Sequence, residues 1–209
     1  APFDSSLLLD PGQVYQYAGN DVKAAANLGV YLADLNYCIL FGKTQLTQQY
    51  FSAAVELSKI VGIEKTALAF LQNRYSENME RNDSVQVISD SLFARSVRDR
   101  KGTQNEKLAG IAMATYQIEN LHLALATLES FPETLTEDQQ ETTVQVVNMV
   151  LRQHSNILII HNFIKTFSDP KDLDKNPNYP YYDNALRELI GTYQKINYVA
   201  PVGKSESLS

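Results

Sequence analysis

The chain has 209 residues, of which 44% are hydrophobic and 20% charged, and its formal net charge is −6. This length suits one globular domain or two small ones, and the apolar content is sufficient for a buried core, so disorder is not expected. No segment approaches the run of about 20 apolar residues that a membrane-spanning helix needs. The acidic balance also argues against nucleic acid as the partner.

The N-terminal residues give a first indication of where the protein is located. The chain begins with Ala1 instead of Met, and residues 1–6 have neither a basic nor an apolar targeting region. We read this as a mature or trimmed N-terminus. We therefore expect an exported protein, periplasmic or anchored to the envelope by a lipid upstream of this chain. One domain is expected over 1–209, with flexible ends at 1–9 and 200–209.

The positions of proline and glycine indicate an all-helical fold. No proline occurs between Pro11 and Pro132, and most glycines stand where a helix would end. In chain order we predict a short segment over 11–18 with Asp10 as N-cap, a long helix from Asn20 or Asp21 to Phe41, a second from an N-cap at Thr44 to about Gly62, and helices over about 64–81, 84–101 and 105–130.

The C-terminal third is predicted to hold a sixth and a last helix. Thr136 caps the sixth, and apolar positions extend it as far as Phe167, with a kink allowed for on account of its length. A polar, proline-rich connector over 168–184 precedes a last helix over about 185–197. Short turns between long helices predict an all-α bundle of about six or seven mostly antiparallel helices, or a stack of helical hairpins.

The first long helix carries a narrow polar line, predicted to face solvent while the rest of the helix packs in the core. Its members are Asn20, Lys23, Asn27 and Asp34. Asn36 lies nearly opposite and is expected to be buried with hydrogen-bond partners. Asp34, Asn36 and Tyr37 are the candidates for a ligand-binding role, whereas an ordinary core amide is the alternative for Asn36. Cys38, the lone cysteine, is interpreted as a small core residue.

Residues that signal catalysis are scarce. No glycine pattern suits a phosphate loop, and no Gly-x-Ser-x-Gly occurs. Glu119 and His122 have the Glu-x-x-His spacing of di-iron carboxylate bundles, but the second copy that those sites need is missing. Helix geometry does not bring His122, His154 and His161 together, so we predict no catalytic residue and no metal there.

Two hypotheses concern the proline-rich connector. Tyr179, Tyr181 and Tyr182 cluster beside prolines and could anchor a protein partner, unless their rings only pin the loop to the bundle.

The same connector resembles a calcium-binding EF-hand loop. Oxygen side chains recur at alternate positions, and the candidate ligands are Asp172, Asp174, Asn176 and Asp183. Pro177 stands where such loops have glycine, and Asp183 replaces the usual Glu. A solvated connector rich in turn formers is therefore the alternative, and no other cofactor is predicted.

A resemblance extends over about the first hundred residues. Asn27-Leu28-Gly29-Val30-Tyr31, the following Ala33-Asp34-Leu35, then Gly42-Lys43-Thr44-Gln45 and Tyr50-Phe51-Ser52-Ala53 resemble uncharacterised exported all-helical proteins of bacteria, many of them lipid-anchored. This resemblance implies export and no particular activity. Leu28-Gly29, Tyr50 and Ala53 are also similar to a tetratricopeptide repeat, but their spacing is too long and no second copy occurs at a period of about 34 residues.

These observations predict a non-catalytic, exported binding or scaffolding protein, whose partner is a protein or a small molecule. The alternative is an accessory protein of the cell envelope that binds a small ligand or calcium. An enzyme that uses paired carboxylates is a further alternative, because such pairs leave no sequence signature on a helical fold.

Overall fold

Capping residues and one glycine turn define the helices at the beginning of the chain. The computed structural model describes residues 3–63, 104–165 and 179–196, and their regular structure is entirely helical, which confirms the predicted all-α fold. Its elements are the 3-10 helices η1 (Ser5–Leu7) and η2 (Pro11–Tyr17), and the α-helices α1 (Asp21–Leu40), α2 (Thr44–Ile60), α5 (Gln104–Glu129), α6 (Glu137–Arg152), α7 (His154–Lys165) and α9 (Tyr179–Lys195). The helices predicted over 64–81 and 84–101 lie outside the described residues.

The chain divides into two units, Ala1–Leu135 and Thr136–Ser209, and each is described here by itself. The sequence predicts a single domain. That expectation stays a prediction, because a division by compactness does not show whether the two units fold independently.

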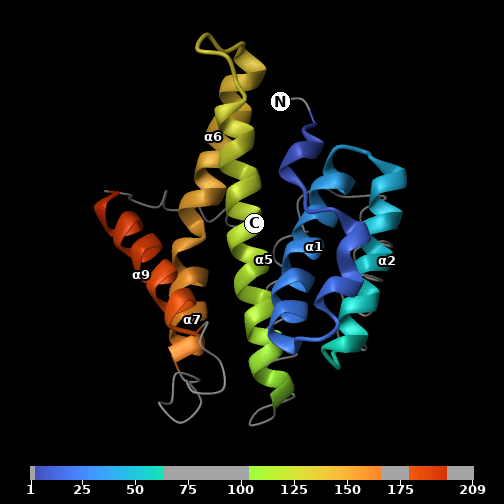
Figure 1. Ribbon diagram of the computed structural model, residues 1–209. Coiled ribbons are helices and arrows are strands. Elements are labelled where there is room, and N and C mark those ends of the chain that lie inside the picture. Colours follow the sequence, from blue (N-terminus) through green and yellow to red (C-terminus); the bar gives the residue numbers. More distant parts are fainter. Residues whose placement is uncertain (1–2, 64–103, 166–178, 197–209) are drawn as a thin grey trace, which may run out of the picture. The chain divides into compact units, whose positions relative to one another are not determined.

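In the first unit, α1 lies between α2 and α5 and packs against both (Figure 1). Small residues permit the close approach to α5: a Cβ at Gly29 would collide with the Ala112 carbonyl oxygen and with Thr115 Oγ1. The hydroxyl of Thr115 also donates to the Ala26 carbonyl oxygen at 2.7 Å. The predicted central position of this helix is therefore confirmed.

Local signals set the ends of α1 as predicted. The side chain of Asn20 accepts a hydrogen bond from the Lys23 N–H at the N-terminus. At the C-terminus Gly42 has a φ of +64°, and its N–H donates to Ile39 while the N–H of Lys43 donates to Cys38, as in a Schellman motif. This tight turn starts α2 one residue earlier than expected. The prediction of Thr44 as N-cap is therefore wrong, since Lys43 holds that position.

The polar line on α1 is exposed only at its beginning. Asn20 and Lys23 are exposed and Asn27 is partly buried, but Asp34 is 0% exposed. The prediction that Asp34 faces solvent is wrong, because the N-terminal residues lie over this part of α1 and the N–H of Leu9 donates to the Asp34 carboxyl.

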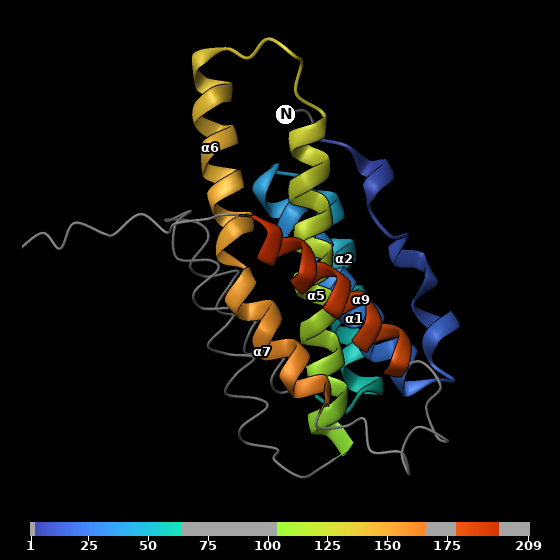
Figure 2. The same ribbon diagram turned by 90° about the vertical axis from the view of Figure 1, so that its left-hand side faces the viewer.

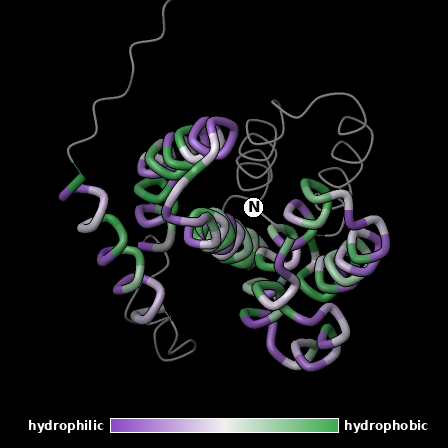
Figure 3. Tube along the Cα trace, turned by 90° about the horizontal axis from the view of Figure 1, so that it is seen from above, coloured by the Kyte–Doolittle hydropathy of each residue, from purple (hydrophilic) through white to green (hydrophobic). Residues whose placement is uncertain are grey.

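In the second unit, the long sixth helix is divided in two. Thr136 and Gln139 form a capping box at the start of α6, as the predicted Thr cap requires. The helix is interrupted at Gln153, and Figure 2 shows the change of direction between α6 and α7, which confirms the kink. Hydrophobic and hydrophilic residues alternate around the helical coils seen end on in Figure 3, as expected of amphipathic helices.

The last helix is longer than predicted. It begins at Tyr179 instead of about Ala185, so the end of the expected connector is helical. Pro180 accounts for the difference: proline is tolerated in the first turn of a helix, where no N–H is needed for the intrahelical pattern. In the described residues α9 packs against α7.

Candidate functional site

The N-terminal residues 3–10, called the N-terminal strap below, are attached to the core of the first unit through their backbone. The hydroxyl of Tyr50 donates to the Leu9 carbonyl oxygen at 2.7 Å, and the hydroxyl of Tyr31 donates to the Asp10 carbonyl oxygen at 2.8 Å. The N–H of Leu9 donates to Asp34 Oδ2 at 3.1 Å. Three core side chains thus fix the backbone immediately before η2.

The beginning of the strap is held in the same way near the end of α1. The N–H of Asp4 donates to the Tyr37 hydroxyl at 3.3 Å, and the Phe3 ring stacks on Tyr37 with centroids 5.4 Å apart. The ammonium of Lys43 lies 4.9 Å from the centroid of the Phe3 ring. Residues 1–9 were expected to be flexible, so these contacts of residues 3–9 are ones that the sequence did not predict.

The electrostatics of Asp34 follow from its burial. Desolvation, together with the nearby charge of Glu119, raises the pKa of Asp34 from its usual 3.8 to about 8, against the opposing effect of the Leu9 N–H. Oδ1 is buried and has no hydrogen-bond partner in the structure. Burial also raises the pKa of Glu119, although the charge of His122 opposes that shift. Asp34 is therefore mostly protonated at neutral pH.

Burial keeps the neighbouring acidic groups neutral as well. It raises the pKa values of the Tyr31 and Tyr50 hydroxyls, which are thus available as donors to the strap. Cys38 is fully buried, as predicted, and burial raises the pKa of its thiol to about 12. Asp34, Tyr31, Tyr50 and Cys38 are therefore mainly protonated at neutral pH, and the first three of them form hydrogen bonds to the strap.

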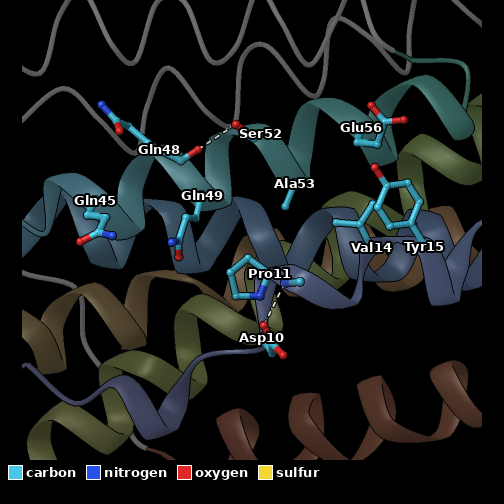
Figure 4. A pocket seen from close by; sticks show the side chains of 11 residues that line it. Asp10, Pro11, Val14, Tyr15, Gln45, Gln48, Gln49, Ser52, Ala53 and Glu56 are labelled. Atoms are coloured by element: carbon cyan, nitrogen blue, oxygen red, sulfur yellow. Dashed lines mark hydrogen bonds between the residues drawn. The ribbon is translucent and has the colours of Figure 1, made fainter.

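An open groove lies between η2 and α2, and we call it the η2–α2 groove (Figure 4). Its volume is about 790 Å³. It is lined by Asp10, Pro11, Gly12, Val14, Tyr15, Gln45, Gln48, Gln49, Ser52, Ala53 and Glu56. Gln45 lies near one end in Figure 4, while Tyr15 and Glu56 lie near the other.

Each wall of the groove has a structural basis. On α2 the lining residues recur at helical spacing from Gln45 to Glu56, so they share one face, over about 16 Å of helix. On the other wall, the Asp10 carboxyl accepts the Gly12 N–H at 2.8 Å and caps η2. Val14 and Ala53 are buried between the two walls. Because the Tyr31 and Tyr50 bonds fix residues 9 and 10, the η2 wall is held against α2.

The predicted ligand-binding residues do not line this groove. Asp34 and Tyr37 both bind the backbone of the strap. Asn36 is only partly buried, so its predicted burial is wrong, but its side-chain amide donates to the Tyr116 hydroxyl at 2.7 Å, which confirms that it finds a hydrogen-bond partner. The structure does not gather the three around one cavity, and a direct ligand-binding role for them stays a prediction.

The tyrosine cluster lies in the first turns of α9. The Tyr181 side chain is 75% exposed, whereas Tyr182 is partly buried and its pKa is raised by that burial. Their ring centroids are 6.2 Å apart in an edge-on arrangement. Tyr179 begins the helix. Partner binding at this cluster stays a prediction.

Of the four predicted calcium ligands, only Asp183 lies within the described residues. Its Oδ1 is 2.8 Å from His161 Nε2, and its Oδ2 accepts a hydrogen bond from Arg187 Nε at 2.7 Å. Oδ1 thus binds across to α7, while Oδ2 binds one turn further along α9. Asp172, Asp174 and Asn176 lie outside the described residues, so calcium binding stays a prediction.

The other histidines have different surroundings. His154 stacks on Tyr193 with ring centroids 5.2 Å apart, and His122 is exposed on α5. Among the residues that the structure describes, no group of three or more His, Cys, Asp or Glu side chains is arranged to hold a metal ion.

Sequence reasoning missed the groove, although one of its walls has a sequence signal. The spacing of Gln45, Gln48, Gln49, Ser52 and Glu56 marks a polar face on the second long helix. Nothing in the sequence shows that η2 lies beside that face.

Comparison with protein-family models, curated proteins and solved structures gives no match. Within the ranges described, no helix is both long enough and apolar enough to cross a membrane.

Proposed function

We propose that this protein is a non-catalytic binding protein that holds a small polar ligand in the η2–α2 groove. The observation that carries the proposal is the groove itself, with a volume of about 790 Å³ between two walls that core hydrogen bonds hold in place. A concave surface whose polar groups are held on a fixed scaffold can orient a small molecule.

The paired carboxyls Asp34 and Glu119 are assigned a structural role in this proposal. Asp34 is fully buried and binds the backbone of Leu9, and neither carboxyl lines the groove. A neutral carboxyl is the form that low-dielectric surroundings favour, so its raised pKa needs no substrate to explain it. We therefore assign Asp34 to positioning the strap.

Export from the cell is the second part of the proposal. It is supported by the resemblance of Asn27–Leu35 to exported helical proteins, many of which are lipid-anchored. Immunodetection after fractionation of the source cells tests it, with periplasm or envelope as the expected location. Recovery of the protein in the cytosolic fraction alone would contradict export.

Retention of small molecules tests the binding function. The full chain is incubated with an extract of the source cells, and retained compounds are identified by mass spectrometry. Ser52→Trp places a large ring in the groove, whereas Gln16→Trp adds the same ring to an exposed residue of η2 that does not line it. The wild type and Gln16→Trp should retain a compound that Ser52→Trp loses. Equal retention by all three proteins, or by none, would refute the proposed function.

A further inference from the structure

The groups that line the η2–α2 groove define the charge of its ligand. None of the lining residues is Lys, Arg or His, whereas Asp10 and Glu56 supply carboxylates. A phosphate, a sulfate or a carboxylate would find no cation among the lining residues and would meet repulsion from Asp10, whereas the Glu56 carboxylate is paired with Lys59 Nζ at 3.3 Å. The groove therefore favours a ligand without negative charge.

The hydrogen-bonding groups of the groove further limit the class of ligand that fits it. Gln45, Gln48 and Gln49 are exposed along one face of α2, and each side-chain amide offers both an acceptor oxygen and donor N–H groups. Ser52 adds a hydroxyl whose hydrogen is directed to the Gln48 carbonyl oxygen at 3.0 Å, so its lone pairs remain for a ligand donor. A hydroxyl group donates and accepts at one atom, and a series of hydroxyls matches a series of amides.

An aromatic ring completes the groove. The Tyr15 side chain is 79% exposed, which leaves a large apolar face in water at the end where Glu56 also lies (Figure 4). A pyranose ring has a face of C–H groups that covers such an aromatic face, while its hydroxyls point outward to polar partners. A sugar chain presents apolar ring faces and hydroxyl groups. Its ring faces match Tyr15, and its hydroxyl groups match the neighbouring glutamines.

We propose that the η2–α2 groove binds a neutral oligosaccharide, with one sugar ring stacked on Tyr15 and hydroxyls hydrogen-bonded to Gln45, Gln48 and Gln49. This inference rests on the proposed function of the groove as a binding site. The α2 face spans about 16 Å, which is long enough for more than one sugar ring. Asp34, Tyr31 and Tyr50 act as positioning residues, because they hold the strap that leads into η2.

Saturation-transfer NMR and calorimetric titration of the full chain test the inference. The probes are three neutral sugars, cellotetraose, maltotetraose and chitotetraose, with tetragalacturonate as the anionic probe and spermidine as the cationic one. At least one neutral tetraose should bind, and tetragalacturonate should not. For that tetraose, Tyr15→Ala should weaken binding by about tenfold through loss of the stacking contact.

Leu40→Ala is the matched control, since Leu40 is similarly exposed at 70% but does not line the groove. It should bind the tetraose as the wild type does. Circular dichroism should show that each variant is folded, because both replaced side chains are largely exposed. A Gln48→Ala, Gln49→Ala double variant should also weaken binding without unfolding the chain.

The inference is overturned if no neutral tetraose binds, if Tyr15→Ala binds like the wild type, or if spermidine is the only probe bound. These outcomes differ from failure of the proposed function. If the extract yields a retained compound that Ser52→Trp loses and that compound is not a saccharide, the groove remains a binding site and only its ligand class is wrong.

Discussion

The Asp34 carboxyl accepts a hydrogen bond from the Leu9 N–H at 3.1 Å, across 25 positions of sequence, and thereby ties the middle of α1 to the strap. The carboxyl is fully buried, and burial raises its pKa to about 8. The protonation state of Asp34 should therefore affect how firmly the strap, and with it the η2 wall of the groove, is held.

Stability should decline as pH rises across the range set by Asp34. Between its usual pKa of 3.8 and about 8, the folded chain keeps a proton that the unfolded chain has lost. The free energy of unfolding therefore falls with rising pH in this window, by at most about 1.4 kcal/mol per pH unit. Asp34→Asn cannot ionise and should flatten the decline, as measured by urea denaturation at several pH values.

The control for this prediction is Asp21→Asn, at an exposed position in the first turn of the same helix. It should keep the wild-type slope. The raised pKa of Glu119 also makes the free energy of unfolding fall as pH rises. The test therefore compares the slope of each variant with that of the wild type, not the slope with zero. An Asp34→Asn variant with the slope of the wild type would contradict the assignment.

Shortening a buried side chain of α1 should lower the free energy of unfolding much more than shortening an exposed one. Leu32 is 1% exposed, whereas Lys23 is exposed near the beginning of the helix. Leu32→Ala should cost about 2–5 kcal/mol of unfolding free energy, and Lys23→Ala should stay within about 0.5 kcal/mol. Urea midpoints measure both. Equal shifts would show that α1 is not placed as described.

Two glycine-to-alanine changes should have opposite signs. A Cβ at Gly29 would collide with the backbone of α5 and with Thr115 Oγ1, so Gly29→Ala should destabilise the first unit. Gly191 lies inside α9 with nothing within 4 Å of its would-be Cβ, so Gly191→Ala should stabilise by up to about 1 kcal/mol through helix propensity. Thermal denaturation followed by circular dichroism compares them. Destabilisation by Gly191→Ala, or none by Gly29→Ala, would be inconsistent with this packing.

Asp183 should contribute more to the stability of the second unit than its exposed partner Arg187 does. Burial opposes ionisation, but hydrogen bonds from Arg187 and His161 outweigh it and lower the pKa of Asp183 below 3.8. Asp183→Asn should cost about 1–3 kcal/mol at neutral pH. Arg187→Ala should cost about 1 kcal/mol or less, since the Arg187 side chain is 59% exposed.

The contribution of Asp183 to stability should change with pH in the opposite direction to that of Asp34. A lowered pKa contributes stability above the ordinary value of 3.8, and that contribution is lost as pH falls through the lowered pKa. The difference between wild type and Asp183→Asn in urea should therefore shrink in acid. A constant difference down to about pH 2 would speak against the proposed ion pairing.

The sequence predicted those parts of the fold that depend on neighbouring residues. The start of a helix at Asn20 or Asp21, Gly42 as its end and Thr136 as a cap all depend on residues within a few positions of the chain. Lys43 instead of Thr44 is the N-cap of α2, because the Gly42 turn is tight. Pro180 was interpreted as part of a connector, although proline also suits the first turn of a helix.

The candidate site could not be predicted in the same way. A carboxylate on a helix is expected to be exposed, and only the strap explains why Asp34 is buried and neutral. The groove requires η2 to lie beside the polar face of α2, and hydrogen bonds from Tyr31 and Tyr50 to the strap hold that arrangement. Hydrophobic periodicity predicts which face of each helix is buried, but it does not predict which distant segment packs against that face.

Besides the stacking of the Phe3 ring on Tyr37, the core binds the strap through hydrogen bonds to peptide groups of the strap. The core side chains bind the N–H groups of Asp4 and Leu9 and the carbonyl oxygens of Leu9 and Asp10. Any amino acid except proline supplies those groups at the donor positions. The side chains of Ser5 and Ser6 are exposed and make none of these bonds, so substitutions there should leave the strap attached, whereas losing the Tyr31 or Tyr50 hydroxyl would release a carbonyl oxygen of the strap.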